Sequence, residues 1–425
     1  MNRRVFLKAG GLSLVTLGLS PSFLRRTALA MELPRAARGK TLIVLFQRGA
    51  ADALNVVVPF GDANYYAARP QLAIGSPARV TGAAGAIDLD GYFGLHPALS
   101  PLKPLWDRGL LAPIHAVGSP SSTRSHFDAQ DYMETGTPDR KGTPDGWLNR
   151  YLAVRGTCEA CTVGEKPANM PFRAVAMTAQ MPRILGGPSP TVAMNSIEEF
   201  SIRTSGGEAE KRLEALYRTG SADMVHGSGT EMFEALRVLR AANPQQYTAA
   251  AGVEYPRSQF GQRLLSIAQL IKAGVGLEVA FADLGGWDTH VNQGGAQGQL
   301  AQRLGDFSAS IAALVADLGD RMDDIVILTM SEFGRTVRQN GTGGTDHGHA
   351  GAMFVIGGSL KTPRKVLGNW PGLAPEQLYE GRDLALTTDF RSVFSELAAK
   401  HLGAGSLERI FPGYATPERN WLGLL

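Results

Sequence analysis

Two short segments of this chain combine carboxylate and imidazole side chains with glycine. The first contains Asp288 and His290, and the second, further along the chain, contains Asp346, His347 and His349. Each comes after an apolar run that is typical of a buried strand. Loops at the ends of strands supply the ligands of many divalent metals. We therefore predict a divalent-metal site built from these two segments.

The same segments have a plainer interpretation. An aspartate or histidine in a glycine-rich loop often caps a turn or hydrogen-bonds the backbone. Two such clusters in one chain favour metal binding over this alternative. Four other histidines have no such neighbours, and we interpret them as packing or surface residues: His96, His115, His226 and His401.

A further aspartate, Asp52, lies in a small-residue turn after the apolar run 41–46. At the carboxyl end of a strand its carboxylate is in a position to bind a metal, although aspartates are also common in ordinary turns. Its neighbour Arg48 would either hold an anionic substrate or pair with Asp52.

Candidate catalytic residues precede a predicted helix in the first third of the chain. A hydroxyl at a helix N-terminus lies near free backbone N–H groups, and a metal ion can lower its pKa. Such a hydroxyl suits attack on a phosphorus or sulfur centre. Ser125 is the preferred nucleophile and Thr123 the second, while Arg124 and His126 are placed for substrate oxygens or proton transfer. Ser125 and Asp128 also have the form of a capping box, so a purely structural cap stays open.

Apolar runs alternate with helical patterns along the chain, as in the βαβ units of an α/β fold. Two helical stretches, 260–273 and 297–318, have apolar residues at i, i+3, i+4 and i+7 spacing. A third stretch, 389–402, looks like a late packing helix. The apolar runs predict a central sheet with strands at 41–46, 111–117, 172–177, 277–282, 325–330 and 352–356.

The region 186–255 is more polar and is predicted to be mostly helical, most clearly at 208–217 and 231–241. A long excursion from a sheet can form an insertion or a lid over a site. A helical layer packed on the sheet is an equally good interpretation.

The N-terminal segment 1–30 resembles a twin-arginine signal peptide. Arg3 and Arg4 precede an apolar stretch, and Ala28 and Ala30 form an A-x-A-like cleavage site. The stretch is short and rich in Gly, Ser and Pro, so we predict no stable membrane span, with an amphipathic anchor helix as the alternative. We expect export by the twin-arginine translocation machinery, which would leave a mature domain of residues 31–425 in the periplasm or outside the cell.

Removal of this segment changes the charge of the chain. The full sequence has 42 basic and 39 acidic residues, a net charge of +3. The segment carries five basic residues and no acidic one, so the mature form has 37 basic against 39 acidic residues, a net charge of −2. The basic character therefore belongs to the export signal and gives no reason to expect nucleic-acid binding.

Cys158 and Cys161 are the only cysteines of the chain. In an oxidising compartment we expect a local disulfide between them, with thiol chemistry as the alternative. A C-x-x-C pair without two further ligands is a poor structural zinc site.

Together these segments resemble an exported family named domain of unknown function 1501, over nearly the whole mature chain. That family looks like a distant relative of the alkaline phosphatase and sulfatase superfamily. The resemblance implies an alkaline-phosphatase-like three-layer sandwich, in which a central, mostly parallel sheet has helices on both faces and carries one or two metals. It rests on the export motif, the Asp52 turn, Ser125-His126-Phe127-Asp128-Ala129-Gln130, Gly286-Trp287-Asp288-Thr289-His290, Ser331-Glu332-Phe333-Gly334-Arg335-Thr336 and the segment from Asp346 to His349.

The resemblance also implies a ligand set. The matching positions are Asp52, Asp288, His290, Asp346, His347 and His349. Glu332 would replace an aspartate ligand of the superfamily, whereas Phe333 stands where the superfamily has a histidine. The absence of a C/S-x-P-x-R segment argues against a formylglycine sulfatase of the standard kind.

These observations predict a metal-dependent hydrolase of phosphate or sulfate esters, acting on an anionic small molecule or a polysaccharide ester. Its one or two divalent ions would be zinc, manganese, calcium or magnesium, because both imidazole and carboxylate ligands are available. One alternative is a catalytically inactive binding or assembly protein that keeps the fold. Another is a purely structural role for the loop residues.

Overall fold

The computed structural model describes residues 39–78, 84–156, 171–198, 200, 233, 235–362, 364–415 and 417–425. All of these residues except Gly39 belong to one unit, Lys40–Leu425. Several features named above lie outside the described residues: the segment 1–30, both cysteines, His226 and the helical piece 208–217. Within the described part of the chain, no helix is long and apolar enough to cross a membrane.

Strand β1 (Thr41–Gln47) shows how the apolar runs are used. All seven of its residues are buried. Leu42, Val44 and Phe46 pack into the core on one face of the sheet, and Ile43 and Leu45 pack into the core on the other. A parallel strand covered on both faces has a continuous apolar sequence instead of an alternating one.

Eight strands form the central sheet in the order β11-β5-β10-β9-β1-β8-β6-β7. Neighbouring strands run parallel, except that β10 is antiparallel to both β5 and β9. Besides β1, the strands are β5 (Leu111–Gly118), β6 (Ala174–Ala176), β7 (Val192–Ala193), β8 (Val279–Leu284), β9 (Ile325–Met330), β10 (Gly351–Gly357) and β11 (Thr388–Asp389). A separate three-stranded sheet contains β2 (Val57–Val58), β4 (Gly94–Leu95) and β3 (Ile87–Asp88).

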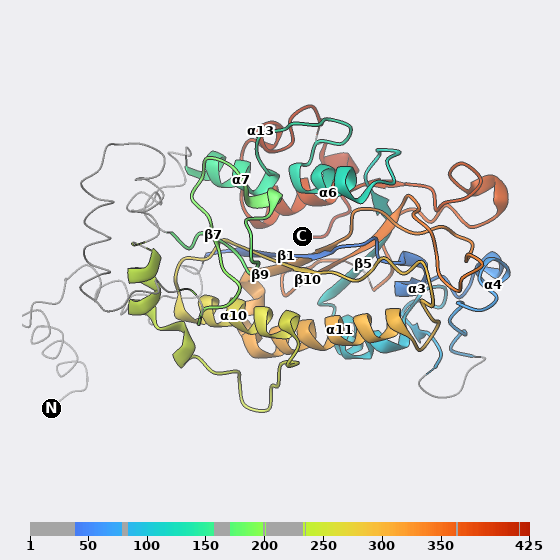
Figure 1. Ribbon diagram of the computed structural model, residues 1–425, viewed down its shortest axis with the longest axis horizontal. Helices are drawn as coiled ribbons and strands as arrows, with labels where there is room; N and C mark the ends of the chain where they lie inside the picture. Colours follow the sequence, from blue (N-terminus) through green and yellow to red (C-terminus); the bar gives the residue numbers. More distant parts are fainter. Residues whose placement is uncertain are drawn as a thin grey trace, which may run out of the picture. The chain divides into compact units, whose positions relative to one another are not determined.

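Helices cover both faces of the central sheet (Figure 1). On one face lie α10 (Gln259–Ala273) and α11 (Gln299–Leu318), whose apolar side chains join those of Ile43 and Leu45. On the other face lie α6 (His126–Thr135), α7 (Trp147–Gly156), α12 (Phe390–Glu396) and α13 (Leu407–Ile410). The shorter helices are α3 (Ala53–Val56), α4 (Ala63–Ala68) and α5 (Lys103–Asp107). The predicted three-layer fold class is confirmed.

The predicted elements are largely confirmed, since all six predicted strands are present and β9 matches its prediction residue for residue. The late helix is α12 followed by a π-helical turn, Leu397–His401. The prediction that 186–255 is mostly helical is wrong at its start, because β7 adds a strand to the sheet there. Further on, Ala235 and Leu239 pack into the core beside α10. Whether the rest of this region forms a lid stays a prediction.

Three of the isolated histidines are packing residues, as predicted: His96, His115 and His401 are all buried. The His115 ring is held in its neutral form, because its Nε2 donates to the Val57 carbonyl at 2.9 Å and its Nδ1 accepts from the Ala116 N–H at 3.0 Å. Burial lowers the pKa of His115 to about 4, from 6.5. A second proton would have to enter at Nδ1, where the Ala116 N–H already lies.

We therefore expect acid destabilisation between pH 6.5 and pH 4. Above pH 6.5 His115 is neutral in both folded and unfolded chains. As the pH falls toward 4 only the unfolded chain takes up the proton, which removes about 3 kcal/mol of stability for this one residue. Denaturant unfolding of the wild type and His115→Gln at pH 7 and pH 4.5 measures the effect. The variant should lose less stability over this interval, and equal losses would contradict the prediction.

Candidate metal centre

The topology brings five segments to one edge of the sheet. The loops after β1, β5, β8 and β9 leave from the carboxyl ends of parallel strands, which all lie at this edge. The loop before β10 arrives at the same edge because β10 runs antiparallel to its neighbours. This is why His347, which precedes its strand, meets His126, Asp288 and His290, which follow theirs.

Two of the histidines have one ring nitrogen fixed as a donor. The Nδ1 of His290 lies 2.9 Å from Oδ1 of Asp346, and the Nδ1 of His347 lies 2.8 Å from the carbonyl oxygen of Arg124. The hydrogen bond from His290 is the main cause of the lowered pKa of Asp346, so that carboxylate is ionised and only accepts. A carbonyl oxygen likewise only accepts. Both Nδ1 atoms therefore carry a proton, which leaves the Nε2 atoms as the ring nitrogens that can bind a cation.

His126 also has its Nδ1 on an acceptor, and the hydrogen bond to Glu332 raises the pKa of this imidazole. Its Nδ1 lies 2.8 Å from Oε1 of the fully buried Glu332, which also accepts from the backbone N–H of Gly49 and from Gln130. Burial alone would raise the pKa of Glu332, but the donors on it, led by His126, bring the pKa below its usual value. The Nε2 of His126 is buried and has no hydrogen-bond partner among the described residues.

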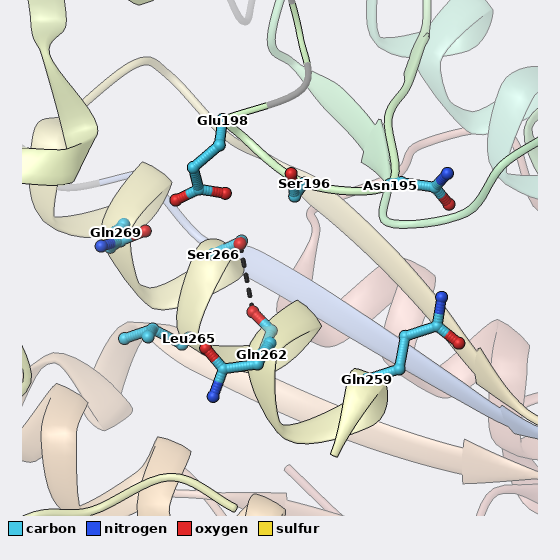
Figure 2. Close-up of a pocket in the computed structure, with 8 residues that line it drawn as sticks. All are labelled: Asn195, Ser196, Glu198, Gln259, Gln262, Leu265, Ser266 and Gln269. Atoms are coloured by element: carbon cyan, nitrogen blue, oxygen red, sulfur yellow. Dashed lines mark hydrogen bonds between the residues drawn. The ribbon is translucent and has the colours of Figure 1, made fainter. Parts of the chain in front are cut away.

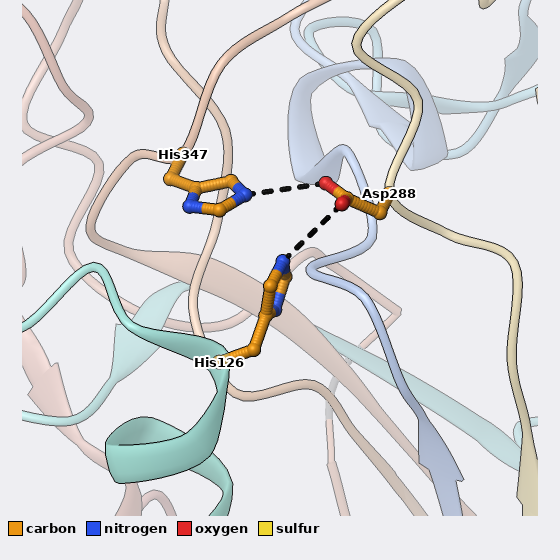
Figure 3. A group of neighbouring side chains, drawn as sticks. All are labelled: His126, Asp288 and His347. Carbon is orange, nitrogen blue, oxygen red and sulfur yellow. Dashed lines mark hydrogen bonds and ion pairs between the residues drawn. The ribbon is translucent and has the colours of Figure 1, made fainter.

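The remaining ring nitrogens converge on Asp288, and Figure 3 shows those of His126 and His347. The Nε2 atoms of His290 and His347 lie 3.0 Å apart, and they are 3.0 and 3.2 Å from Oδ1 of Asp288. The Nε2 of His126 lies 3.5 Å from Oδ2 of the same carboxylate. Ligand atoms of His126, Asp288 and His347 all lie within 4.8 Å of one another. Lone pairs that face each other so closely repel unless a proton or a cation lies between them.

This donor set fits a divalent ion. Ligand atoms around a tetrahedral zinc, with bonds of 2.0–2.1 Å, are about 3.3 Å apart, close to the 3.0–3.2 Å spacings of His290, His347 and Asp288. Metal-binding histidines usually donate their other ring N–H to a carboxylate or carbonyl, as all three do here. Phe333 packs against His126 and His347, with ring centroids 5.1 Å from each, and so helps to fix the two rings.

Arg335 controls the charge of Asp288. Its side chain is fully buried, and its Nη2 donates to Oδ1 of Asp288 at 2.7 Å. Burial alone would raise the pKa of Asp288, but the positive charge of Arg335 and the neighbouring histidines lower it below the ordinary value. The Nε and Nη1 of Arg335 have no partner among the described residues. The carboxylate is therefore held ionised, in the form that binds a cation.

Gly49 allows the loops after β1 and β8 to approach closely. It has φ +119°, and a Cβ atom there would lie 2.7 Å from the backbone nitrogen of Asp288. Any other residue would push the Asp288 segment away. The same glycine donates its N–H to Glu332 at 2.8 Å, so it links the carboxylate behind His126 to the backbone of Asp288.

Replacement of Glu332 should weaken metal binding without removing a direct ligand. In Glu332→Gln the charge that orients His126 is lost, and partners of this kind typically contribute 10–100-fold to metal affinity. Competition with a chelator of known affinity would measure this loss in the purified variant. Glu278→Gln is the matched control, since Glu278 pairs with Arg173 away from the cluster. Equal affinities for the two variants would contradict the assignment.

The structure does not bring Asp52 into this cluster. Asp52 is fully buried, and its Oδ2 accepts from Arg69 and from Gln293, both at 2.6 Å. The Oε1 of Gln293 accepts from Thr289 and Thr345, which directly precede His290 and Asp346. Through Gln293, Asp52 thus holds the two loops that carry His290 and Asp346, and it is not itself one of the converging groups.

Two other predicted residues have partners elsewhere. His349 is buried and stacks on Tyr379, with ring centroids 4.2 Å apart. The guanidinium of Arg124 pairs with Asp383 at 2.7 Å and Glu380 at 2.6 Å, so only its backbone carbonyl contacts the cluster.

Arg48 does not pair with Asp52. Its guanidinium binds Asp283 at 2.7 Å and Glu134 at 2.9 Å. Its charge is therefore balanced by two carboxylates.

Ser125 is the N-cap of α6, and its hydroxyl accepts weakly from the Asp128 N–H at 3.5 Å. The predicted cap is therefore present. Its half-buried side chain directly precedes His126 in the chain, so the hydroxyl lies at the N-terminus of the helix that supplies His126 to the cluster. The Thr123 hydroxyl accepts from the Ser125 N–H at 3.3 Å and supports this turn.

Sequence reasoning missed several residues that organise the centre. His126 was assigned to substrate oxygens or proton transfer and not to metal binding, although a histidine one residue after a helix cap could have been considered as a ligand. Arg335 lies inside a quoted motif, but its ion pair with Asp288 has no local signal. The other missed residues are Gln130, Gln293 and Asn340, of which Asn340 donates to both the His290 carbonyl and Asp346.

A separate polar cavity of about 350 Å³ lies between the segment after β7 and α10 (Figure 2). Its lining includes Asn195, Gln259, Gln262 and Gln269, and Glu198 is its only charged residue. It shares no residue with the cluster. Neutral amides offer hydrogen bonds but no set of metal ligands, so this cavity is not the metal centre.

A family model described as "Protein of unknown function (DUF1501)" matches residues 114–409. The chain belongs to this family. In chain order, the match to the DUF1501 model runs from within β5 to beyond β11, and the central strand β1 precedes it. It includes all four groups that converge in the candidate centre: His126, Asp288, His290 and His347. Gly49 and Asp52 precede the matched residues. A comparison with curated proteins found no match.

Two solved structures show distant similarity to this DUF1501 protein. The lipoteichoic acid synthase LtaP from Listeria monocytogenes is 10% identical, with a TM-score of 0.35 over 77% of this chain and 68% of its own. A 2-O GAG sulfatase is also 10% identical, with a TM-score of 0.26 over 78% of this chain and 66% of its own. At such scores the likeness carries no conclusion about activity.

Proposed function

We propose that this protein is an exported, metal-dependent hydrolase of phosphate or sulfate esters. The observation that carries the proposal is the convergence of three imidazole nitrogens on the carboxylate of Asp288. Each of these rings has its other nitrogen committed to an acceptor. An ordinary turn does not require such an arrangement, in which three ring nitrogens lie 3.0–3.5 Å from one carboxylate.

His126, Asp288, His290 and His347 would hold one or two divalent ions. When bound, such an ion supplies positive charge that stabilises the ester oxygens and lowers the pKa of a nearby hydroxyl. Asp288 directs its two carboxylate oxygens to different histidines, so both oxygens would be available to hold such an ion. Arg335 keeps this carboxylate ionised and fixed.

Ser125 is the proposed nucleophile, with Thr123 as the second candidate. The Ser125 Oγ would form a bond to phosphorus or sulfur while the bond to the leaving alcohol breaks, and the alcohol takes up a proton as it departs. Water then cleaves the ester on Ser125 and restores the hydroxyl. The N-terminus of α6 favours the negative charge of the ester group, because its first N–H groups point toward that end of the helix.

The location of the protein is part of the proposal. The twin-arginine motif and the A-x-A-like site in 1–30 support export by the twin-arginine machinery. The mature protein would then meet esters outside the cytoplasm, either small anionic molecules or polysaccharide esters.

A second candidate function is that of a binding or assembly protein that keeps the fold without catalysis. The burial of Asp52 in an ion pair with Arg69 favours it, since that aspartate is not available as a ligand. The contact of Arg335 with Oδ1 of Asp288 favours it as well, because a bound ion would share that oxygen.

Hydrolysis assays distinguish the two functions. The mature protein, loaded with zinc or manganese, would be tested on 4-nitrophenyl phosphate and 4-nitrophenyl sulfate beside Ser125→Ala and Ser125→Gly. Activity that needs metal and is lost in both variants, with metal retained, supports the hydrolase. Absence of stoichiometric metal together with no turnover of any ester would favour the binding protein, and so would full metal content without turnover. Activity that survives in both variants would remove Ser125 from the mechanism and leave Thr123.

A further inference from the structure

Large apolar side chains are exposed in only three places among the described residues. Phe127 is 90% exposed, Val291 51% and Met181 40%. Each lies in a loop or helix start that follows the carboxyl end of a strand: β5, β8 and β6 respectively. All three therefore lie at the edge of the sheet that carries the candidate metal centre.

Phe127 and Val291 are the direct chain neighbours of two groups in the cluster, His126 and His290. The His126 and His290 rings each pack against the ring of His347, with centroids 4.3 and 4.8 Å away. Phe127 and Val291 therefore belong to the two segments that supply His126 and His290 to one cluster of imidazoles. An almost fully exposed phenylalanine loses the stability that burial would give, so a partner in contact with it would recover that energy.

Met181 is more peripheral. Arg183, two residues after it, pairs at 3.0 Å with Asp131, which lies one turn further along α6 than Phe127. Met181 belongs to the same edge but does not adjoin a residue of the cluster.

The surroundings favour a substrate over a protein or a membrane as the partner. Phe127 and Val291 are only two exposed apolar side chains, whereas a stable protein interface contains about 20–30 residues from each partner. The rim is acidic, with exposed carboxylates at Asp288, Asp346 and Glu380, and the Arg124 charge is already paired. An acidic rim repels the broad anionic lipid surface that attracts peripheral proteins, whereas a divalent ion held by the cluster would offset these charges for a single ester group.

We propose that Phe127, together with Val291, forms an apolar platform that binds the apolar face of a ring next to the ester oxygen of the substrate. The inference deepens the proposed hydrolase function and rests on it. The metal centre would hold the anionic group, and the Phe127 ring would pack against the adjoining part of the alcohol. An aryl group and the carbon face of a saturated ring share this chemistry. Phe127 is therefore a specificity residue and takes no part in bond breaking.

Binding of non-hydrolysable anions tests the platform. Titration calorimetry on zinc- or manganese-loaded protein would compare methyl-, cyclohexyl- and phenylphosphonate, and methane- with benzenesulfonate. We expect a preference of about tenfold for the ring compounds over the methyl compounds. Phe127→Ala should remove this preference and leave methyl binding unchanged. A preference for phenyl over cyclohexyl would identify an aryl group. Equal binding of the two would show that the platform accepts aryl and saturated rings alike.

Met181→Ala is the matched control, because it removes an exposed apolar side chain from the same edge but away from the cluster. It should keep the full preference. Equal binding of ring and methyl compounds by the wild type, or equal losses in the Phe127 and Met181 variants, would overturn the platform and leave the hydrolase standing. If metal-loaded protein bound none of these anions, the proposed function and the platform would both fall.

Discussion

The Asp288→Asn variant should bind divalent metal more than about 100-fold more weakly than the wild type. Replacing a residue that only hydrogen-bonds a metal ligand typically costs 10–100-fold in metal affinity. This change instead removes the charge of the carboxylate on which three imidazoles converge. The amide also leaves the buried Arg335 without its anionic partner, so positive charge would then face the ion. Titration with zinc and manganese against a chelator of known affinity measures the loss.

Asp128→Asn is the matched control for this experiment. Asp128 lies at the same edge, at the start of α6, but its carboxylate pairs with Lys141 at 2.9 Å and not with the cluster. Its metal affinity should equal that of the wild type. If Asp288→Asn kept wild-type affinity while folded, the ion would have to bind elsewhere, and the candidate centre would be wrong.

A second large effect is expected on stability from Arg69→Met. Arg69 and Asp52 are both fully buried and 2.6 Å apart, so the variant leaves the Asp52 carboxylate without a compensating charge. Breaking a buried pair in this way costs about 3–5 kcal/mol. The variant also loses the hydrogen bonds of Arg69 to the carbonyls of Thr336 and Val337. Urea unfolding at neutral pH would show the change in the free energy of unfolding.

The double variant Arg69→Met with Asp52→Asn separates charge from packing. Removal of both charges should restore part of the lost stability, because no unpaired charge stays buried. Lys103→Met provides the contrast, since the Lys103–Asp107 pair is partly exposed and should contribute less than about 1 kcal/mol. A double variant less stable than Arg69→Met would contradict this account of the pair.

The sheet could be predicted from the sequence because burial on both faces is a local property. A strand such as β9 is buried at every position and apolar at all of them except Thr329, and its ends are set by polar turn residues. The direction of β10 could not be predicted, because an antiparallel strand in a mostly parallel sheet has a similar apolar sequence. Because β10 runs antiparallel to its neighbours, the segment before it, with Asp346 and His347, reaches the carboxyl edge of the sheet.

The candidate site was predictable in its residue types more than in their roles. Asp288, His290 and His347 stand out through their spacing, and the structure brings them together. The partner of Asp52 could not be read from the sequence, since Arg69 is one of many arginines and becomes a partner only through the folded path of the chain. His349 has the same chemical character as His347, but its ring packs against Tyr379 instead.

The central claim is that the converging histidines and Asp288 bind metal. Elemental analysis of the mature protein, purified without chelator and without a metal-affinity tag, tests it most directly, beside the His290→Ala variant. The account predicts one or two equivalents of a divalent metal in the wild type and their loss in the variant. No metal in the wild type, even after incubation with zinc and manganese, would contradict it.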